Sequence, residues 1–232
     1  MNDTARTTFL SRVGAAVRAG NKHREAARRE LPPTVGYVGA GDDPIGRLCD
    51  ELTKVGVRVT RVGTQEQVAA AVRSLVDPFS IRRAVLNSAE ILNEFEIAAL
   101  LRNASVELTT SDDLAVLEEN ARREKQFAAD LGVAAPDWAI AETGSLVYAA
   151  GPAQTRSATL LPPVHLAVVD ATCVLPDLLD LTARLAGRLV DGVLPRNVAI
   201  VTGPSKTGDI ELKLTTGVHG PGEVHVLIWE RK

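Results

Sequence analysis

The sequence predicts a three-layer α/β protein, in which a mainly parallel sheet lies between helices. Short apolar runs that are typical of strands alternate with segments of helical periodicity along most of the chain, and this alternation favours parallel pairing. The chain has 232 residues, of which 45% are hydrophobic, so it can bury a full core without disulfides or metals. It contains no low-complexity linker and no internal repeat. We therefore expect one large α/β domain.

An additional helix is expected before this domain. Residues 4–30 carry apolar side chains at helical spacing among arginine and glutamate, and two consecutive prolines follow. The apolar residues are Phe9, Leu10, Val13, Ala16 and Val17. Interleaved glutamates favour a solvated face beside the main domain over a basic membrane-binding face. The predicted organisation is an N-terminal amphipathic helix at residues 1–33 and a single α/β domain at residues 34–232.

The first half of the domain is predicted from its caps and periodicities. A strand at residues 34–38 leads through a glycine-rich turn, which lacks the G-x-G-x-x-G dinucleotide fingerprint, into a helix. Asp43 caps this helix, Pro44 is its first residue and Gly56 closes it. The following segments are strands at 57–62, 84–87 and 106–109 and helices at 64–76, 91–101 and 114–131, the first of these helices opened by a capping box of Thr64 and Gln67.

The second half begins with a hairpin or bulged strand at residues 139–148, because the polar sequence at 142–145 interrupts two apolar pieces. A loop at 150–161 follows. The later segments are a strand at 164–169, a helix at 176–190, a strand at 198–201, a turn with a short helical link, and a strand at 223–228. His165 and His225 lie inside strands, where structural histidines are expected.

Composition argues against several function classes. The net charge of −3 gives no reason to expect an extended basic face for nucleic acid. No apolar run approaches the roughly 20 residues of a membrane span, and the first residues lack the apolar core of a signal peptide. The two cysteines, Cys49 and Cys173, are too few for an iron–sulfur cluster, which normally takes four thiolates. We expect a cytoplasmic protein with reduced thiols and no cluster of its own.

The densest turn chemistry follows the apolar strand at 198–201. The predicted ligand-binding residues of this turn are Gly203, Ser205, Lys206, Thr207 and Asp209. Backbone N–H groups and a lysine in a strand–turn–helix setting attract anions, although the spacing is not that of a P-loop, in which glycine directly precedes the lysine. An alternative is that Ser205 or Thr207 caps the next short helix, with Asp209 at its positive end.

Three further side chains complete the predicted site. His219 lies in a glycine-rich turn, where a substrate contact or a general acid–base role suits a histidine better than a place in the core. Glu142 lies in a polar break at a strand end and is a candidate nucleophile or base, with hydrogen bonding to nearby amides as an equal alternative. Arg156 is expected to complete the pocket. Asp209, Glu211 and His219 match no metal-ligand spacing, so no metal site is predicted.

Together these segments resemble the signature of a known family, the lactate utilisation protein C family with its LUD domain. The similar segments, in chain order, are residues 141–147, 161–165, 202–211, 217–221 and 223–228. Two positions depart from the family pattern: Gly208 stands where alanine is more common, and Lys206 stands where arginine is frequent. Lysine keeps the charge but lacks the planar fork that holds an anion at two points.

The resemblance implies a fold like that of the ribose-phosphate isomerase, glucosamine-phosphate deaminase and CoA-transferase superfamily. It also implies a part in the oxidation of L-lactate to pyruvate, with two partner proteins of which at least one carries iron–sulfur clusters. In this interpretation the chain is a non-redox subunit or accessory protein that holds a small carboxylate, a phosphate or a partner. The alternative is a free-standing acyl-transfer, CoA-transfer or sugar-phosphate enzyme in which Glu142 is the nucleophile, like the analogous glutamate of CoA-transferases.

The predicted site has one geometric requirement. The turns at 203–207 and 217–222 are expected to face a common pocket. Lys206, His219 and Glu142 are therefore expected to lie close together in the folded chain.

Overall fold

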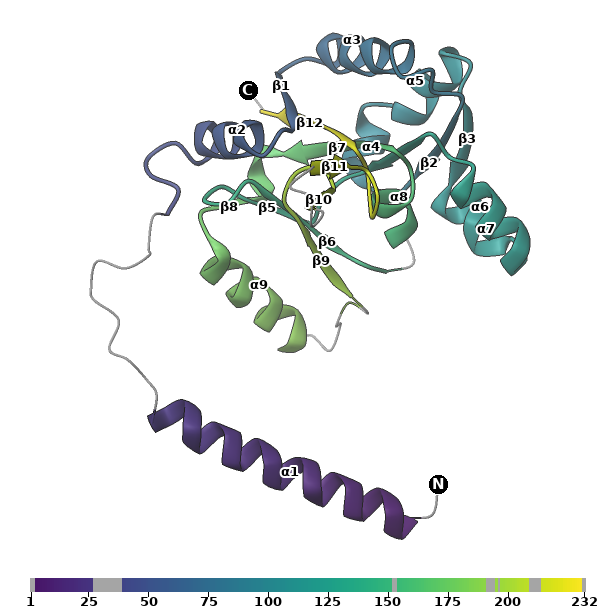
Figure 1. The fold of residues 1–232 in the computed structure, drawn as a ribbon. Coiled ribbons are helices and arrows are strands. Elements are labelled where there is room, and N and C mark those ends of the chain that lie inside the picture. Colours follow the sequence, from purple (N-terminus) through teal and green to yellow (C-terminus); the bar gives the residue numbers. More distant parts are fainter. Residues whose placement is uncertain are drawn as a thin grey trace. The chain divides into compact units, whose positions relative to one another are not determined.

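The computed structural model describes residues 3–26, 39–151, 154–190, 195, 197–208 and 214–230 (Figure 1). The chain divides into two units, residues 1–37 and residues 38–232, which we describe separately. The first unit contains helix α1 (Asp3–Ala26), which confirms the predicted N-terminal helix. The strand expected at residues 34–38 lies outside the described residues, and the domain boundary after residue 33 remains a prediction. None of the described helices combines the length and the apolar character that a membrane span needs.

The second unit is built around a six-stranded sheet, which confirms the mainly parallel sheet of the predicted fold (Figure 1). Its strands in spatial order are β1 (Arg58–Val62), β12 (Glu223–Trp229), β7 (Val164–Asp170), β4 (Leu131–Ala134), β2 (Arg83–Leu86) and β3 (Glu107–Thr110). Every neighbouring pair is parallel. All six strands therefore begin at one edge of the sheet, the amino edge, and end at the other, the carboxyl edge.

One face of this sheet is covered by helices α3 (Gln65–Val76), α4 (Glu90–Glu94) and α5 (Ile97–Asn103) (Figure 1). Helices and strands share a core cluster that includes Val72, Leu101, Leu86, Leu131 and Leu166. The single helix predicted at 91–101 is wrong. Glu96 takes a left-handed conformation, with φ 50°, and this backbone geometry ends α4 and separates it from α5.

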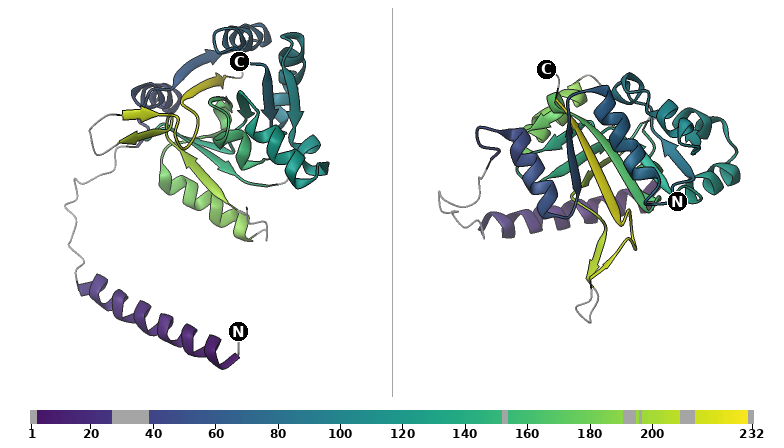
Figure 2. Two further views of the ribbon diagram at one scale, coloured as in Figure 1. Left: turned by 45° about the vertical axis from the view of Figure 1, so that its right-hand side comes forward. Right: turned by 90° about the horizontal axis from the view of Figure 1, so that it is seen from above.

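The opposite face is covered by helices and by a second sheet. The strand order of the second sheet is β8 (Val174–Leu175), β5 (Trp138–Ile140), β6 (Ser145–Ala149) and β9 (Val198–Val201). Leu48 and Leu52 of helix α2 (Pro44–Lys54) pack in one core cluster with Val226 of the large sheet and Leu146 of the second. Helix α9 (Leu178–Val190) covers the outer side of the second sheet (Figures 1 and 2). The large sheet thus lies between two layers, as predicted, but the second layer contains strands as well as helices.

Local capping signals in the sequence are confirmed where they start helices. The Asp43 side chain accepts a hydrogen bond from Gly46 N at 2.9 Å at the start of α2. The Thr64 hydroxyl accepts from Gln67 N at 3.3 Å at the start of α3. The second half of this capping box differs from the prediction, because the Gln67 side chain accepts from Gly63 N at 2.7 Å. The predicted hairpin is also present, since β5 and β6 pair antiparallel.

The long helix predicted at 114–131 is wrong. The segment contains two short helices, α6 (Ser111–Val116) and α7 (Glu119–Phe127), and then the central strand β4. The Thr110 capping box starts α6 early, and Leu117 has an extended backbone, with ψ 144°, that ends it. Strand β4 was missed because it is a run of four apolar residues that contains Gly132. A Cβ at Gly132 would overlap the Ala158 carbonyl oxygen, so this strand needs glycine to let the chain pass over it.

Three other segments differ from the predictions. The loop expected at 150–161 contains helix α8 (Arg156–Leu160), and a short 3-10 helix, η1 (Ala171–Cys173), leads into the unpredicted β8. The short helical link expected after the turn at Gly203 is replaced by strands β10 (Lys206–Gly208) and β11 (Leu214–Thr216), which pair antiparallel. Figure 2 shows this ribbon extending away from the large sheet. Over the described residues, the strand–turn–helix setting assumed for the anion site is therefore a strand–turn–strand.

Candidate functional site

The two predicted turns contact each other through Ser205. The Ser205 N–H donates to the Pro221 carbonyl at 2.8 Å, and the Gly217 N–H donates to the Ser205 carbonyl at 2.9 Å. The Ser205 hydroxyl accepts from the His219 N–H at 3.3 Å. The structure therefore brings Ser205 and His219 together, with His219 exposed to solvent.

Lys206 has a structural contact that the sequence did not indicate. Its Nζ donates to the Val55 carbonyl at 2.6 Å. Val55 is the C-cap of α2, where carbonyl groups lack partners within the helix and a cation is favourable. Gly203 packs on the same residue, because a Cβ at Gly203 would lie 2.9 Å from Val55 Cγ2. This contact uses one of the three hydrogens on Nζ and leaves two that could bind an anion.

Both turns lie at the amino edge of the large sheet. Strand β12 begins directly after the second turn, and the N–H groups of Gly222 and Glu223 donate to the Pro163 carbonyl, just before β7, at 3.0 and 3.2 Å. Ligands of open α/β sheets usually bind at the opposite edge, where the strands end. The predicted anion turns are therefore at the edge that this rule does not favour.

Glu142 lies in the turn between β5 and β6. Its Oε1 accepts from Gly39 N at 3.4 Å, and its own N–H donates to the Pro176 carbonyl at 3.1 Å. Gly39 precedes α2 and Val55 follows it, so the Glu142 carboxylate and the Lys206 ammonium bond to different backbone partners. Gly144, two residues after Glu142, packs against Glu51 and Leu52 in the C-terminal half of α2. The expected meeting of Glu142, Lys206 and His219 in one pocket stays a prediction.

Three hydroxyl groups connect the Glu142 turn to the start of the Gly203 turn. Ser145 Oγ lies 2.7 Å from Thr143 Oγ1 and 2.7 Å from Thr202 Oγ1. Ser145 is buried and is the middle one of these three hydroxyl groups. The two turns are therefore neighbours along the paired ends of β6 and β9, although their charged side chains point to different backbone partners.

Arg156 lies elsewhere, at the carboxyl edge of the large sheet. It lines a small cavity of about 10 Å³, whose other lining residues are Asn87, Tyr148, Ala150, Gln154, Thr155, Thr159 and Ala199. Asn87 directly follows β2 and continues its ladder, because its N–H donates to the Val133 carbonyl of β4 at 3.0 Å. Arg156 and the two turns therefore lie at opposite edges of the large sheet, separated by the length of its strands.

The Tyr148 phenol lines this cavity, and its hydroxyl group contacts the buried His165 imidazole. His165 Nδ1 lies 3.0 Å from the Gly132 carbonyl oxygen, which can only accept, so Nδ1 carries the hydrogen. Nε2 therefore accepts from the Tyr148 hydroxyl at 2.8 Å. Burial lowers the pKa of His165 to about 4 and raises the pKa of Tyr148 well above its usual value, so both groups are neutral. His165 is the satisfied structural histidine that the sequence predicts.

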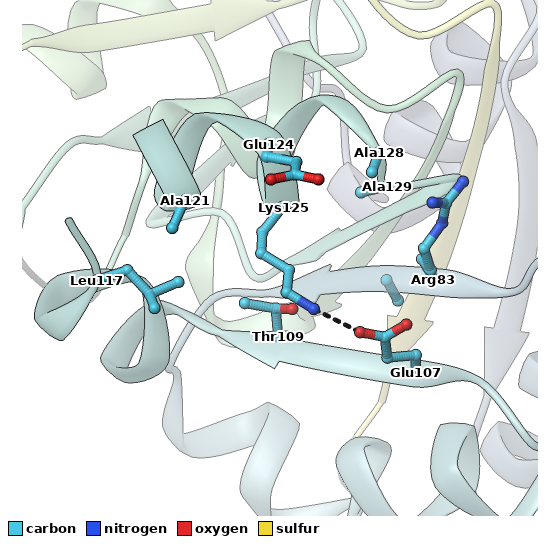
Figure 3. A pocket seen from close by; sticks show the side chains of 10 residues that line it. Arg83, Glu107, Thr109, Leu117, Ala121, Glu124, Lys125, Ala128 and Ala129 are labelled. Carbon is cyan, nitrogen blue, oxygen red and sulfur yellow. Dashed lines mark hydrogen bonds and ion pairs between the residues drawn. The ribbon is translucent and has the colours of Figure 1, made fainter. Parts of the chain in front are cut away.

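A larger cavity, of about 220 Å³, lies between α7 and strands β2 and β3 (Figure 3). Its apolar walls are Ala84, Leu117, Ala121, Ala128 and Ala129. Lys125 Nζ is 2.6 Å from Glu107 Oε1 at its rim, where Arg83 and Glu124 also lie. Helix α7 buries none of its side chains and lines the cavity with Ala121, Glu124 and Lys125, so the cavity is the gap beneath a helix that packs loosely on the sheet. The sequence predicted no site here.

The rest of the predicted site cannot be placed in the same way. Asp209 and Glu211 lie outside the described residues, as does the side chain of Thr207. Within the part of the chain that the structure describes, no group of three or more histidine, cysteine or carboxylate side chains could hold a metal ion.

Sequence reasoning missed Asn87 and Gln154, although it named Arg156. One available signal was the position of Asn87 directly after a buried strand, where ligand groups of α/β sheets gather. The contact that makes Asn87 important joins residues 68 apart in the chain, through Thr155, and no local pattern shows it.

Comparisons with known proteins agree on one family. The family model described as the LUD domain matches residues 45–229. Lactate utilization protein C of Halalkalibacterium halodurans is 27% identical over 223 residues, which cover 93% of this chain and 94% of that protein. Lactate utilization protein C 1 of Bacillus mycoides is 30% identical over 183 residues, which cover 78% of this chain and 77% of that protein.

A solved structure supports the fold. The crystal structure of a DUF162 family protein from Deinococcus radiodurans aligns with a TM-score of 0.58 and 18% identity, over 81% of this chain and 96% of that one. At this identity the likeness concerns the fold alone. The wider resemblance to the ribose-phosphate isomerase and CoA-transferase superfamily stays a prediction.

Proposed function

Since the chain belongs to the LUD domain family, we propose that it acts in L-lactate utilisation, as a non-redox component that works with iron–sulfur partner proteins in the oxidation of L-lactate to pyruvate. The observation that carries this proposal is the similarity to a protein named lactate utilization protein C over nearly the full length of both chains.

The distribution of thiols supports the division of labour in this proposal. Oxidation of a secondary alcohol to a ketone releases two electrons and two protons, which need an acceptor. The sequence has two cysteines, whereas a cluster held by thiolates takes four. Burial raises the pKa of Cys173 to about 12 and also raises the pKa of Cys49, so both remain protonated thiols at neutral pH. The proposal therefore assigns the clusters to partners.

Under this proposal the paired turns at the amino edge are the surface that meets a partner or a small anion. Ser205 fixes the backbone of both turns, and the side chains of Lys206 and His219 are exposed beside it. A fixed backbone with exposed cationic and imidazole groups offers hydrogen-bond donors without a large ordering cost.

Deletion of the gene tests the function. We expect the deletion strain to fail on L-lactate as sole carbon source, to grow on pyruvate, and to recover on L-lactate when the gene is restored. Pyruvate separates a defect in lactate oxidation from a general defect in growth on small acids. Normal growth of the deletion strain on L-lactate would refute the proposal.

A free-standing transferase is the second candidate, because Glu142 is a partly buried carboxylate oriented by Gly39 N in a strand-end turn. The purified chain is incubated with acyl-CoA donors and carboxylate acceptors, and Glu142→Ala is compared with the unaltered protein. CoA transfer by the chain alone, abolished by this substitution, would favour the transferase over the accessory role.

A further inference from the structure

The crevice around Arg156 lies where the connections of two neighbouring strands diverge. From the carboxyl end of β2 the chain passes to β3, on one side. From the carboxyl end of β4 it passes through the second sheet to β7, on the other side. Divergent connections leave a crevice outside the strand ends, and this is the position where open α/β sheets bind ligands.

Hydrogen bonds hold the walls of the crevice in place. The Asn87 side chain accepts from Thr155 N at 3.0 Å and from Thr155 Oγ1 at 2.9 Å, and it donates to the Thr155 carbonyl at 3.2 Å. The Gln154 side-chain amide donates to the Ala135 carbonyl, just after β4, at 2.7 Å. Residues 154 and 155 are therefore tied to the ends of both diverging strands.

The hydroxyl groups that line the crevice can only accept further hydrogen bonds. The hydrogen of Tyr148 goes to His165 Nε2, that of Thr155 goes to Asn87 Oδ1, and that of Thr159 goes to the Arg156 carbonyl at 3.0 Å. A ligand group that bonds to one of these three hydroxyl oxygens must therefore bring its own hydrogen.

Gln154 adds a fourth acceptor. Its amide orientation follows from the bond of its nitrogen to a carbonyl oxygen, so Oε1 is the remaining atom. Oε1 is buried and has no hydrogen-bond partner among the described residues. The cavity beside it, about 10 Å³, has room for a single oxygen-sized group.

Arg156 supplies charge at the mouth. Its side chain lines the cavity and is exposed to solvent, and it forms no ion pair with the described residues. A guanidinium is suited to a carboxylate, which it can bind with two parallel hydrogen bonds.

We propose that this crevice binds a small 2-hydroxycarboxylate. The carboxylate binds Arg156, and the hydroxyl on the adjacent carbon enters the cavity and donates to Gln154 Oε1. The choice of L-lactate within this class rests on the proposed function. A 2-oxo acid has no hydrogen to donate to Gln154 Oε1, and a 2-amino acid would bury an ammonium among neutral groups, so both should bind more weakly than the hydroxy acid.

Binding to the purified full chain tests the proposal, with isothermal titration calorimetry as the measurement. L-lactate is expected to bind roughly tenfold or more tightly than pyruvate, propionate or L-alanine, because these lack a neutral donor at the second carbon. Arg156→Ala is expected to weaken L-lactate and propionate alike. Gln154→Met is expected to remove the preference for L-lactate over propionate while propionate binding is kept, a pattern that simple unfolding does not produce. The matched control is Arg184→Ala, at an exposed position on α9, which should bind as the unaltered chain does.

Equal binding of L-lactate and propionate, no binding of L-lactate, or unchanged binding by Arg156→Ala would each overturn the proposal. These outcomes are separable from failure of the proposed function. A deletion strain that cannot grow on L-lactate, together with a purified chain that does not bind it, refutes the crevice and keeps the function. Binding with normal growth of the deletion strain does the reverse.

Discussion

Acidification should destabilise the protein through the buried His165. Burial lowers the pKa of this imidazole from 6.5 to about 4 in the folded chain, and unfolding restores the ordinary value. Between these two pH values the unfolded state binds a proton that the folded state does not, so the free energy of unfolding rises with pH. The contribution is fully present above pH 6.5 and is lost as the pH falls toward 4. It amounts to about 3 kcal/mol in all, or about 1.4 kcal/mol per pH unit inside the window.

The measurement compares the unaltered chain with His165→Gln in urea unfolding at several pH values across this window. Glutamine can donate to the Gly132 carbonyl and accept from Tyr148, as the imidazole does, but it does not titrate. Carboxylates elsewhere in the chain affect both proteins equally, so the difference in slope isolates His165. Parallel loss of stability in the unaltered chain and His165→Gln would refute the buried neutral imidazole.

Two further substitutions test contacts that position the elements. Gly132→Ala should cost about 2 kcal/mol or more in the free energy of unfolding, because its methyl group would overlap the Ala158 carbonyl oxygen; Gly187→Ala, on α9 with nothing within 4 Å of the added Cβ, should be neutral or stabilising by up to about 1 kcal/mol. Lys206→Met should cost about 1 kcal/mol, since it removes the charged hydrogen bond to the Val55 carbonyl, and a thermal melt indistinguishable from that of the unaltered chain would contradict the capping role.

Much of the fold followed from local patterns in the sequence. The alternation of strands and helices predicted the parallel sheet, and Asp43 and Pro44 predicted the first residue of α2. Such signals depend on residues close together in the chain. Strand β4 could not be found in this way. Its four residues are buried because β4 pairs with β2 on one side and with β7 on the other, and both neighbours are distant in the sequence. The central position of a strand is a tertiary property.

The candidate site was predictable to a smaller extent. The two turns that were predicted to face a common pocket contact each other through Ser205, since two short glycine-rich turns beside sequential strands meet at one edge. The predicted proximity of Lys206, His219 and Glu142 stays a prediction. The lysine in the first turn gave no sign that it caps a helix 151 residues earlier in the chain. Arg156 was named, but its neighbours could not be, because the crevice exists only once the strand order is known.

The three hydroxyl groups of Thr143, Ser145 and Thr202 must all donate their hydrogen bonds in one common direction. Ser145 has one hydrogen and two neighbours, so it donates to one of Thr143 and Thr202 and accepts from the other. All three hydroxyl groups then donate in the same direction. The hydroxyl at one end of the series can donate to an outside group, and the hydroxyl at the other end can only accept from one. A group that accepts a hydrogen bond at Thr202 therefore turns the far end, beside Glu142, into an acceptor, and the reverse also holds. The two turns are therefore linked by the common direction of these hydrogen bonds as well as by packing.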